Sequence, residues 1–139
     1  MKGIAKILIL DKPTINGHIY PHAIFEAAIK DYWKLIEKER AFGELSPYPG
    51  MAIPRTTIDL SNVSHQITNL EIQGDEVFAE IFVLNTPRGK LLQGMIASDS
   101  PLKISFRNRG TGKMSADHTI HDYKLLAIDA IMPPEATPL

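Results

Sequence analysis

The sequence predicts a single α+β domain in which strands predominate and two helices accompany them. Apolar residues recur at helical spacing over 21–40, with Lys and Glu on the other face, which predicts an amphipathic helix. Residues 76–84 alternate between apolar and other side chains, which predicts a strand. Thr86 before Pro87 is typical of a helix start, and we expect this second helix to run to about residue 98.

The other elements of the first half follow from local composition. Residues 5–10 are an apolar run that predicts an opening strand, and the Asn16-Gly17 pair that follows is typical of a turn. Residues 41–55 hold two glycines and three prolines, which predicts an irregular loop without a regular element. Residues 56–67 alternate as a strand, and a turn over 69–75 would join it to the strand over 76–84 as a hairpin.

The second half ends in two predicted strands separated by a loop. The first covers 102–107, and the polar, glycine-containing stretch over 110–122 predicts a flexible loop. The closing strand covers 123–131 and ends before the Pro133-Pro134 pair, because proline cannot donate to a sheet.

Composition restricts the function classes. The chain has 139 residues, 44% hydrophobic and 22% charged, which fits one domain over 1–139. A formal net charge of -1 gives no overall attraction to nucleic acid or to an anionic membrane. We find no apolar stretch of the roughly 18 to 20 residues that a membrane span needs, so we expect a cytoplasmic protein. The absence of cysteine excludes thiol catalysis, so a covalent nucleophile must be an oxygen or an amine.

A histidine and a serine offer the two central parts of a serine hydrolase. A hydroxyl attacks a carbonyl poorly unless an imidazole takes its proton and donors stabilise the oxyanion. His65 and Ser105 lie on strand-like segments and could supply base and nucleophile, while Arg107, Arg109 and Gly110 could support the oxyanion. The alternatives are a solvated histidine, a serine on a polar strand face and two surface arginines.

Other candidates are weaker. His118 and His121 stand three residues apart with aspartates beside them, which invites a metal interpretation, but a solvated loop is the better one, and we expect no metal site. His18 and His22, near the start of the first helix, are interpreted in the same way. Glu44 is a further acidic candidate for the site, or an anchor of its loop or of a subunit boundary.

Six segments stand in an order that resembles one family. They are residues 15–21 (INGHIYP), 43–45 (GEL), 63–65 (VSH), 83–90 (VLNTPRGK), 104–107 (ISFR) with Gly110, and 128–130 (IDA). Over residues 5–135 the chain resembles the prohead core proteases of T-even-like tailed bacteriophages, which are head maturation serine peptidases.

The resemblance implies a fold and three catalytic roles. The fold would be a mostly antiparallel, β-barrel-like core with flanking helices, as in herpesvirus assemblins. His65 would be the general base and Ser105 the nucleophile. The closing strand holds no histidine to orient His65, so Asp129 is the proposed third member.

The resemblance also implies a setting for the reaction. The substrates would be scaffold and capsid precursor proteins, cleaved after Leu or Ile, any residue, then Glu. Cleavage would take place inside the assembling prohead in the host cytoplasm, by a homo-oligomer that needs no cofactor.

A different class of function remains open, namely a catalytically inactive β-domain with a structural or interaction role in a phage particle. His18 stands where relatives carry arginine, and Ser46-Pro47 stands where they carry His-Pro. These departures and the missing second histidine favour the inactive domain, whereas the intact surroundings of His65 and Ser105 favour the peptidase.

Overall fold

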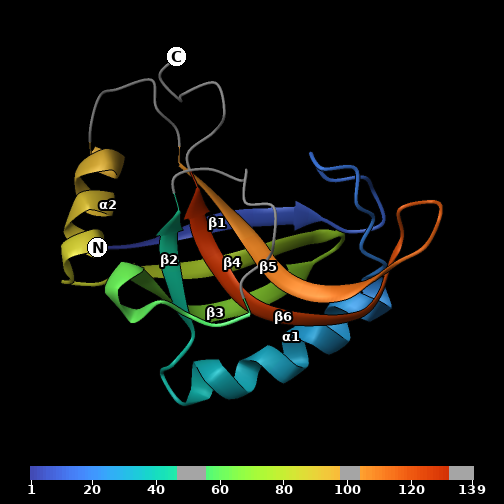
Figure 1. Cartoon of the computed structure of the whole chain (residues 1–139), viewed down its shortest axis with the longest axis horizontal. Helices are drawn as coiled ribbons and strands as arrows, with labels where there is room; N and C mark the ends of the chain where they lie inside the picture. The colour runs from blue at the N-terminus through green and yellow to red at the C-terminus, as the bar shows by residue number, and fades with distance from the viewer. Residues whose placement is uncertain (47–55, 98–103, 132–139) are drawn as a thin grey trace.

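The computed structural model describes residues 1–46, 56–97 and 104–131. These residues form a six-stranded sheet with two α-helices (Figure 1). In chain order the elements are β1 (Lys2–Ile9), α1 (His22–Glu37), β2 (Phe42–Ser46), the 3₁₀ turn η1 (Leu60–Asn62), β3 (Val63–Gln73), β4 (Glu76–Val83), α2 (Pro87–Ala97), β5 (Ser105–Met114) and β6 (Ile120–Ile131). The α+β class predicted from the sequence is confirmed.

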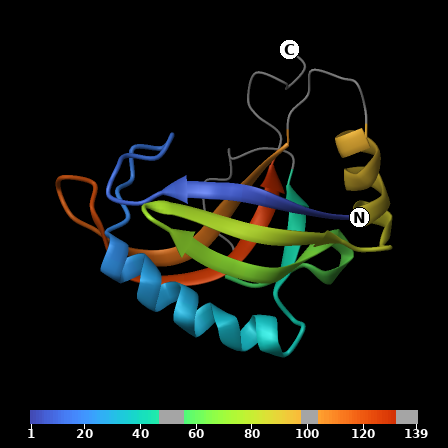
Figure 2. The same ribbon diagram turned by 180° about the vertical axis from the view of Figure 1, so that it is seen from behind.

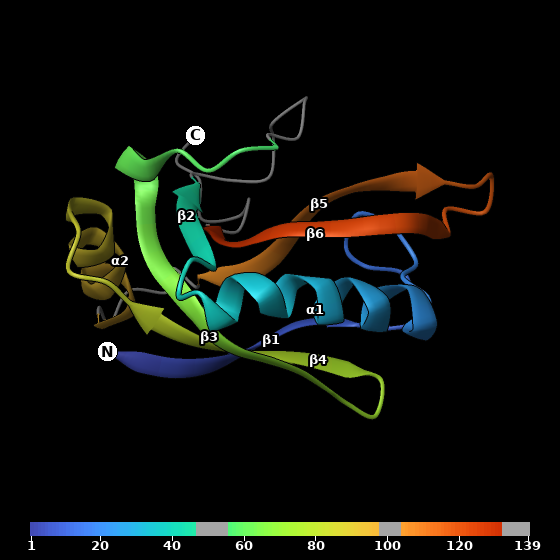
Figure 3. The ribbon, with the colours of Figure 1, turned by 90° about the horizontal axis from the view of Figure 1, so that it is seen from below.

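The sheet is mixed and curls into a half-barrel. Its strand order is β1-β4-β3-β2-β6-β5. Neighbouring strands run antiparallel except β2 and β6, which run parallel where Leu45 pairs with Ala130. The curl brings the two outer strands, β1 and β5, close together across the open side of the half-barrel (Figures 1 and 3).

Helix α1 packs against β6 and β3 and covers part of the main core (Figures 2 and 3). Its buried residues recur at helical spacing, as the sequence predicts, and they are Phe25, Ala28, Ile29, Tyr32 and Ile36. Burial of this stripe stabilises the helix more than helix propensity does, because an isolated helix of this length is marginal in water.

Helix α2 begins as the sequence predicts. The hydroxyl of Thr86 accepts a hydrogen bond from the backbone N–H of Gly89 at 2.9 Å, which is an N-cap. The same hydroxyl donates to the carbonyl oxygen of Val63 at 2.6 Å and so ties the start of α2 to the start of β3. Leu92, on the inner face of α2, is fully buried and packs with Leu45 in a small second core.

Two sequence predictions in the middle of the chain are wrong. Within the expected irregular loop, residues 42–46 form β2, because their backbone pairs with β3 on one side and β6 on the other. The expected strand over 56–67 begins only at Val63, because Asp59 accepts a hydrogen bond from the N–H of Ser61 and caps η1. The predicted hairpin of β3 with β4 is confirmed, although β3 runs to Gln73 and the turn is tight. Residues 47–55 of the loop lie outside the described residues.

The expected loop over 110–122 is also largely wrong. β5 continues to Met114, and β6 begins at Ile120. Gly110 lies in this hairpin at a place where the chain packs too closely for a side chain. A Cβ there would lie 2.3 Å from the carbonyl oxygen of Lys124 and 2.5 Å from the hydroxyl of Tyr123. The start of the strand predicted over 102–107, and the Pro133-Pro134 pair, lie outside the described residues.

Candidate active site

His65 is fully buried on β3, and both of its ring nitrogens are hydrogen-bonded within the protein. Nε2 lies 2.7 Å from the carbonyl oxygen of Ile128 on β6, and Nδ1 lies 2.8 Å from the hydroxyl of Ser64. Because a carbonyl oxygen can only accept, Nε2 must carry the proton, and Nδ1 of the neutral ring accepts from Ser64. Burial lowers the pKa of His65 below its ordinary value, although the bond to Ile128 and the charge of Asp129 oppose this shift.

Gly43 leaves the space through which His65 reaches Ile128. It pairs with His65 across β2 and β3. A Cβ at position 43 would lie 2.1 Å from Nε2 of His65 and 2.2 Å from the carbonyl oxygen of Ile128. No side chain larger than hydrogen fits between the two strands here. This steric restriction explains why the Gly-Glu-Leu segment has a glycine at position 43.

Ser105 is the first residue of β5, at the edge of the sheet, and is half-buried. The next residue, Phe106, packs its ring edge to face with the imidazole of His65, with 5.2 Å between ring centroids. Because successive strand residues point to opposite faces, Ser105 points away from the face on which His65 lies. The structure therefore brings Phe106 against His65, and it places Ser105 one residue away on the other face.

Asp129 belongs to a buried ionic network on this other face. Nε of Arg109 donates to Oδ2 of Asp129 at 2.7 Å, and an amino group of Arg109 donates to Oε2 of Glu44 at 3.0 Å. Oδ1 of Asp129 accepts from the backbone N–H of Glu44 at 3.0 Å. Glu44 in turn accepts from the backbone N–H of Asp59 and the amide of Asn62, each at 3.2 Å. Asp129 thus contacts Arg109 and Glu44, and it influences His65 through charge.

This network fixes three strands and the segment before η1. Arg109 lies on β5, Asp129 on β6 and Glu44 on β2, and the arginine also donates to the carbonyl oxygen of Thr57 at 3.0 Å. Buried carboxylates and guanidinium groups are tolerated only when they are paired and hydrogen-bonded. Glu44 therefore has the anchoring role that was one of its two sequence interpretations.

The residues proposed to support an oxyanion lie in different surroundings. Arg107 is half-buried and lines a cavity together with Ser105. Arg109 donates to the network described above. Gly110 lies within β5, paired with Leu125, where the sequence predicts a loop. Arg107 thus shares this cavity with Ser105, and neither Arg109 nor Gly110 is among the described residues that line it.

Two cavities meet at Ile104 and Phe106, the residues on either side of Ser105. One has a volume of about 640 Å³ and lies between the start of β1, α2 and the start of β5. The other has a volume of about 590 Å³, lies between the second half of β1, the loop after it and β5, and includes Ser105 in its wall. Ala5, Ile104 and Phe106 line both cavities, so the two share a wall beside the serine.

Of the remaining histidines, His18 lines the cavity that includes Ser105, whereas His22, His118 and His121 do not. His118 is in the turn between β5 and β6 with φ 66°, and His121 is in β6, where a loop was expected. Among the residues that the structure describes, no group of three or more His, Cys, Asp or Glu side chains could hold a metal ion. In the same part of the chain, no helix is both long and apolar enough to cross a membrane.

Ser64, Gly43 and Phe106 were not predicted from the sequence as neighbours of His65. Gly43 gave the clearest signal, since a glycine inside a strand often marks a close backbone approach. Ser64 and Phe106 are ordinary strand residues, and only the pairing of β2 with β3 and the curl of the sheet bring them to the site.

Comparison with known proteins identifies the family. The fold resembles that of gp21, the capsid assembly protease of bacteriophage T4, with a TM-score of 0.73 and 23% sequence identity over 94% of this chain and 80% of that one. No protein of curated function matches the chain. The family model for the prohead core protein serine protease matches residues 7–138. The chain therefore belongs to the prohead core serine protease family.

Proposed function

We propose that the chain is a serine endopeptidase that cleaves scaffold and capsid precursor proteins during maturation of a phage prohead. The single protease domain would cover residues 1–139 and would act inside the prohead in the host cytoplasm. The family match over nearly the whole chain carries this proposal. The likeness to the T4 capsid assembly protease supports the substrate class, and the likeness to herpesvirus assemblins stays a prediction.

Ser105 is the proposed nucleophile and His65 the proposed general base. His65 takes the hydroxyl proton while the oxygen of Ser105 bonds to the scissile carbonyl carbon. His65 then gives this proton to the leaving amine, the C–N bond breaks, and water hydrolyses the acyl-enzyme. Ser105 is suited to this role because it lies on an edge strand and lines a cavity.

In this proposal the conformation of the structure is inactive, because His65 and Ser105 are not yet in contact. His65 is buried and donates from Nε2 to Ile128, and Ser105 faces the other side of β5. Before catalysis, the start of β5 must shift so that the hydroxyl of Ser105 comes within hydrogen-bond reach of the imidazole. Contact between subunits of a homo-oligomer would supply this trigger, which would keep the enzyme silent until the prohead assembles.

Asp129 and the arginines complete the proposed machinery. Asp129 follows Ile128, and its charge raises the pKa of His65 and so favours the imidazolium that forms during the reaction. Arg107, Arg109 and Gly110 are the proposed oxyanion support. Arg107 is the best placed of these because it shares a cavity with Ser105, while Arg109 acts by holding Asp129.

The test is cleavage of a precursor-like peptide that contains Leu-x-Glu, followed by mass spectrometry over a range of protein concentrations. We expect the natural chain to cut after Glu, and Ser105→Ala and His65→Ala to abolish cutting while circular dichroism shows a folded protein. Ser64→Ala is the matched control. The hydroxyl of Ser64 is hydrogen-bonded to His65, but the side chain is fully buried and so is not accessible to a substrate. Loss of cutting in Ser64→Ala alone would move the nucleophile to Ser64.

One observation favours the second candidate, an inactive structural domain. Both ring nitrogens of His65 are satisfied inside the core, as in a histidine with a purely structural role. Absence of cutting by the natural chain within assembled proheads, together with normal head assembly by Ser105→Ala, would support the inactive domain over the peptidase.

A further inference from the structure

Ser64 occupies a bulge in β3. Gly43 of β2 pairs with His65. The next residue of β2, Glu44, pairs with Val63, so Ser64 is an extra residue between two paired positions. In a regular strand, the side chains of neighbouring residues point to opposite faces. The bulge removes this restriction, and the hydroxyl of Ser64 lies 2.8 Å from Nδ1 of His65.

The backbone of this bulge is held by the connection between β4 and α2. The N–H of Leu84 donates to the carbonyl oxygen of Ser64 at 3.0 Å, and the hydroxyl of Thr86 donates to that of Val63 at 2.6 Å. A Cβ on Gly89, in the first turn of α2, would lie 2.9 Å from the carbonyl oxygen of Ser64. This close packing fixes the bulge, and with it the position of the Ser64 hydroxyl relative to the imidazole.

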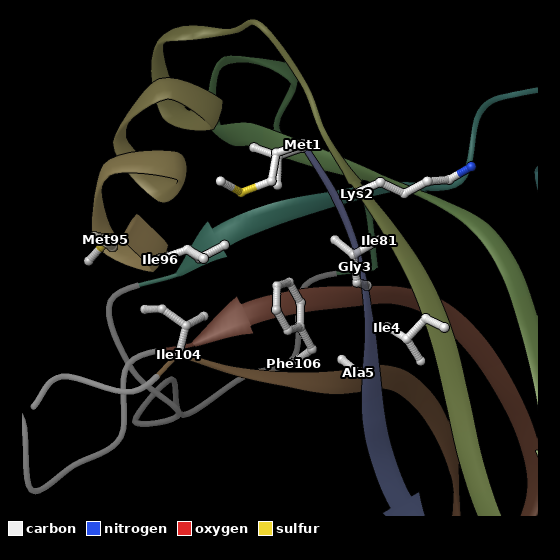
Figure 4. A pocket seen from close by; sticks show the side chains of 11 residues that line it. Met1, Lys2, Gly3, Ile4, Ala5, Ile81, Met95, Ile96, Ile104 and Phe106 are labelled. Atoms are coloured by element: carbon white, nitrogen blue, oxygen red, sulfur yellow. The ribbon is translucent and has the colours of Figure 1, made fainter. Parts of the chain in front are cut away.

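Ser64 lies out of reach of a bound peptide. Phe106 packs against the ring of His65 and also lines the larger of the two cavities, as Figure 4 shows. Ser64 and His65 are both fully buried, and neither is among the described residues that line the two cavities. A peptide in the larger cavity would reach the imidazole only past Phe106. The Ser64 hydroxyl is therefore placed to orient the ring and not to attack a substrate.

The two hydrogen-bond partners of the imidazole differ in the bonds that they can form. The carbonyl oxygen of Ile128 can only accept, so it serves the ring only while Nε2 carries a proton. A hydroxyl can donate to an unprotonated Nδ1, as in this structure, or accept from a protonated one. In the proposed reaction Nε2 must be unprotonated to take the proton of Ser105, so the neutral ring must then carry its proton on Nδ1. Of the two partners, only Ser64 can stay bonded through this change.

We propose that Ser64 is the positioning residue for His65, and that its hydroxyl donates to Nδ1 in the inactive conformation and accepts from Nδ1–H once Nε2 faces Ser105. The proton of the Ser105 hydroxyl then moves to Nε2, and the imidazolium keeps its Nδ1–H bond to Ser64. This bond is charge-assisted and stronger than the neutral one, so Ser64 favours the imidazolium. The catalytic part of the inference rests on the proposed function, whereas the bond to Nδ1 does not.

Asp129 has a different part in the site. It is paired with Arg109 at 2.7 Å and accepts from the backbone N–H of Glu44 at 3.0 Å, so it acts on His65 through its charge. These charged groups of β6, β5 and β2 are the same in every variant below. Differences between the variants therefore report on the hydroxyl of Ser64.

The first measurement is ¹⁵N NMR of histidine-labelled Ser105→Ala protein, which does not depend on catalysis. The Nδ1 signal of His65, assigned by its loss in His65→Gln, should be that of an unprotonated nitrogen that accepts a hydrogen bond. Ser64→Ala should move this signal towards the position of an unprotonated nitrogen without a hydrogen bond. Thr68→Val is the matched control and should leave the signal in place, because Thr68 also stands in a bulge of β3 but its hydroxyl donates to Glu80 at 2.7 Å.

The second measurement is cleavage of the precursor-like peptide at several pH values. Ser64→Ala should lower kcat about tenfold with KM unchanged, the effect of one hydrogen bond made in the transition state, whereas Ser105→Ala abolishes cleavage. The acidic limb of kcat/KM should move to lower pH in Ser64→Ala, because the imidazolium loses a stronger bond than the neutral ring does. Ser64→Thr keeps the hydroxyl and should restore both properties, and Thr68→Val should change neither.

Three results would overturn the inference. They are an unchanged Nδ1 signal in Ser64→Ala, cleavage by Ser64→Ala at the natural rate with the natural pH profile, and a loss in folded Ser64→Thr as large as in Ser64→Ala. Failure of the proposed function is a separate result. If the natural chain does not cut although Ser64→Ala moves the Nδ1 signal, the peptidase and the catalytic role fall together, and Ser64 orients a structural histidine.

Discussion

Nε2 of His65 donates a 2.7 Å hydrogen bond to the carbonyl oxygen of Ile128, through the space that a Cβ on residue 43 would occupy. The bond joins β3 to β6 across β2, which lies between them in the sheet. It fixes the proton on Nε2 of the buried ring. The proposed general base therefore also connects β3 to β6.

Gly43→Ala should destabilise the fold by about 2 to 3 kcal/mol, the usual cost of an added methyl group in a well-packed interior. The new Cβ would meet His65 and the backbone of Ile128, which cannot move independently of its strand. Urea unfolding measures the change. Gly94→Ala is the matched control, since nothing lies within 4 Å of a Cβ at that position in α2, and it should be neutral or stabilise by up to about 1 kcal/mol. Equal stability of the two variants would contradict the steric role of Gly43.

Stability should fall as the pH drops below about 6.5, in part because of His65. Its pKa in the folded protein is lowered, chiefly by burial, from an ordinary value of 6.5. Below that value the unfolded chain binds a proton that the folded chain does not, so the contribution is complete above pH 6.5 and declines as the pH falls towards the folded pKa.

Urea midpoints between pH 8 and pH 5 test this, with His65→Gln as the comparison. The slope of the urea midpoint against pH should be shallower in the variant, because it lacks the contribution of His65. The four other histidines are common to both proteins. Parallel slopes would mean that His65 is as easily protonated in the folded chain as in the unfolded one.

Arg109→Met should cost about 3 to 5 kcal/mol, because it leaves the buried carboxylates of Glu44 and Asp129 without their guanidinium partner. Chemical denaturation measures the loss. Lys113→Met on the same strand is the control, since its ion pair with Asp122 is exposed and 3.8 Å long, and it should change stability by less than about 0.5 kcal/mol. A cost for Arg109→Met as small as that of the control would show that the network is not a stabilising element.

Tyr32→Phe should leave stability unchanged or raise it by up to about 1 kcal/mol. The side chain is 1% exposed, and its hydroxyl has no hydrogen-bond partner among the described residues. Removal of an unsatisfied buried hydroxyl relieves a desolvation cost. Tyr123→Phe is the matched comparison, because the hydroxyl of Tyr123 accepts from the amide of Asn108 at 2.8 Å, and it should cost about 1 kcal/mol. Thermal or urea unfolding measures the stability of both variants. A clear loss of stability in Tyr32→Phe would reveal a partner for the hydroxyl of Tyr32.

Local patterns in the sequence were enough for the elements whose stability is local or whose buried face is regular. The stripe around Phe25 and Tyr32 predicted α1, and the Thr86-Pro87 pair predicted the start of α2. The alternation in residues 76–84 predicted β4. The order of six short segments indicated the family, which the match over residues 7–138 confirms.

Elements stabilised by distant partners could not be predicted in this way. β2 lies in a segment rich in glycine and proline, and it is a strand only because β3 and β6 pair with its two edges. The extension of β5 through Gly110 depends on close packing against Tyr123 and Lys124.

The α+β class, the two helices and the residue types available for acyl transfer can be predicted from spacing and composition along the chain. Which of these groups meet depends on the folded arrangement of the strands. Arg109, proposed as oxyanion support, donates to Asp129 and Glu44, and His65 lies against Phe106 with Ser105 on the opposite face. Strand register and sheet curl set the face on which each of these side chains lies. Both arise from contacts between residues far apart in sequence.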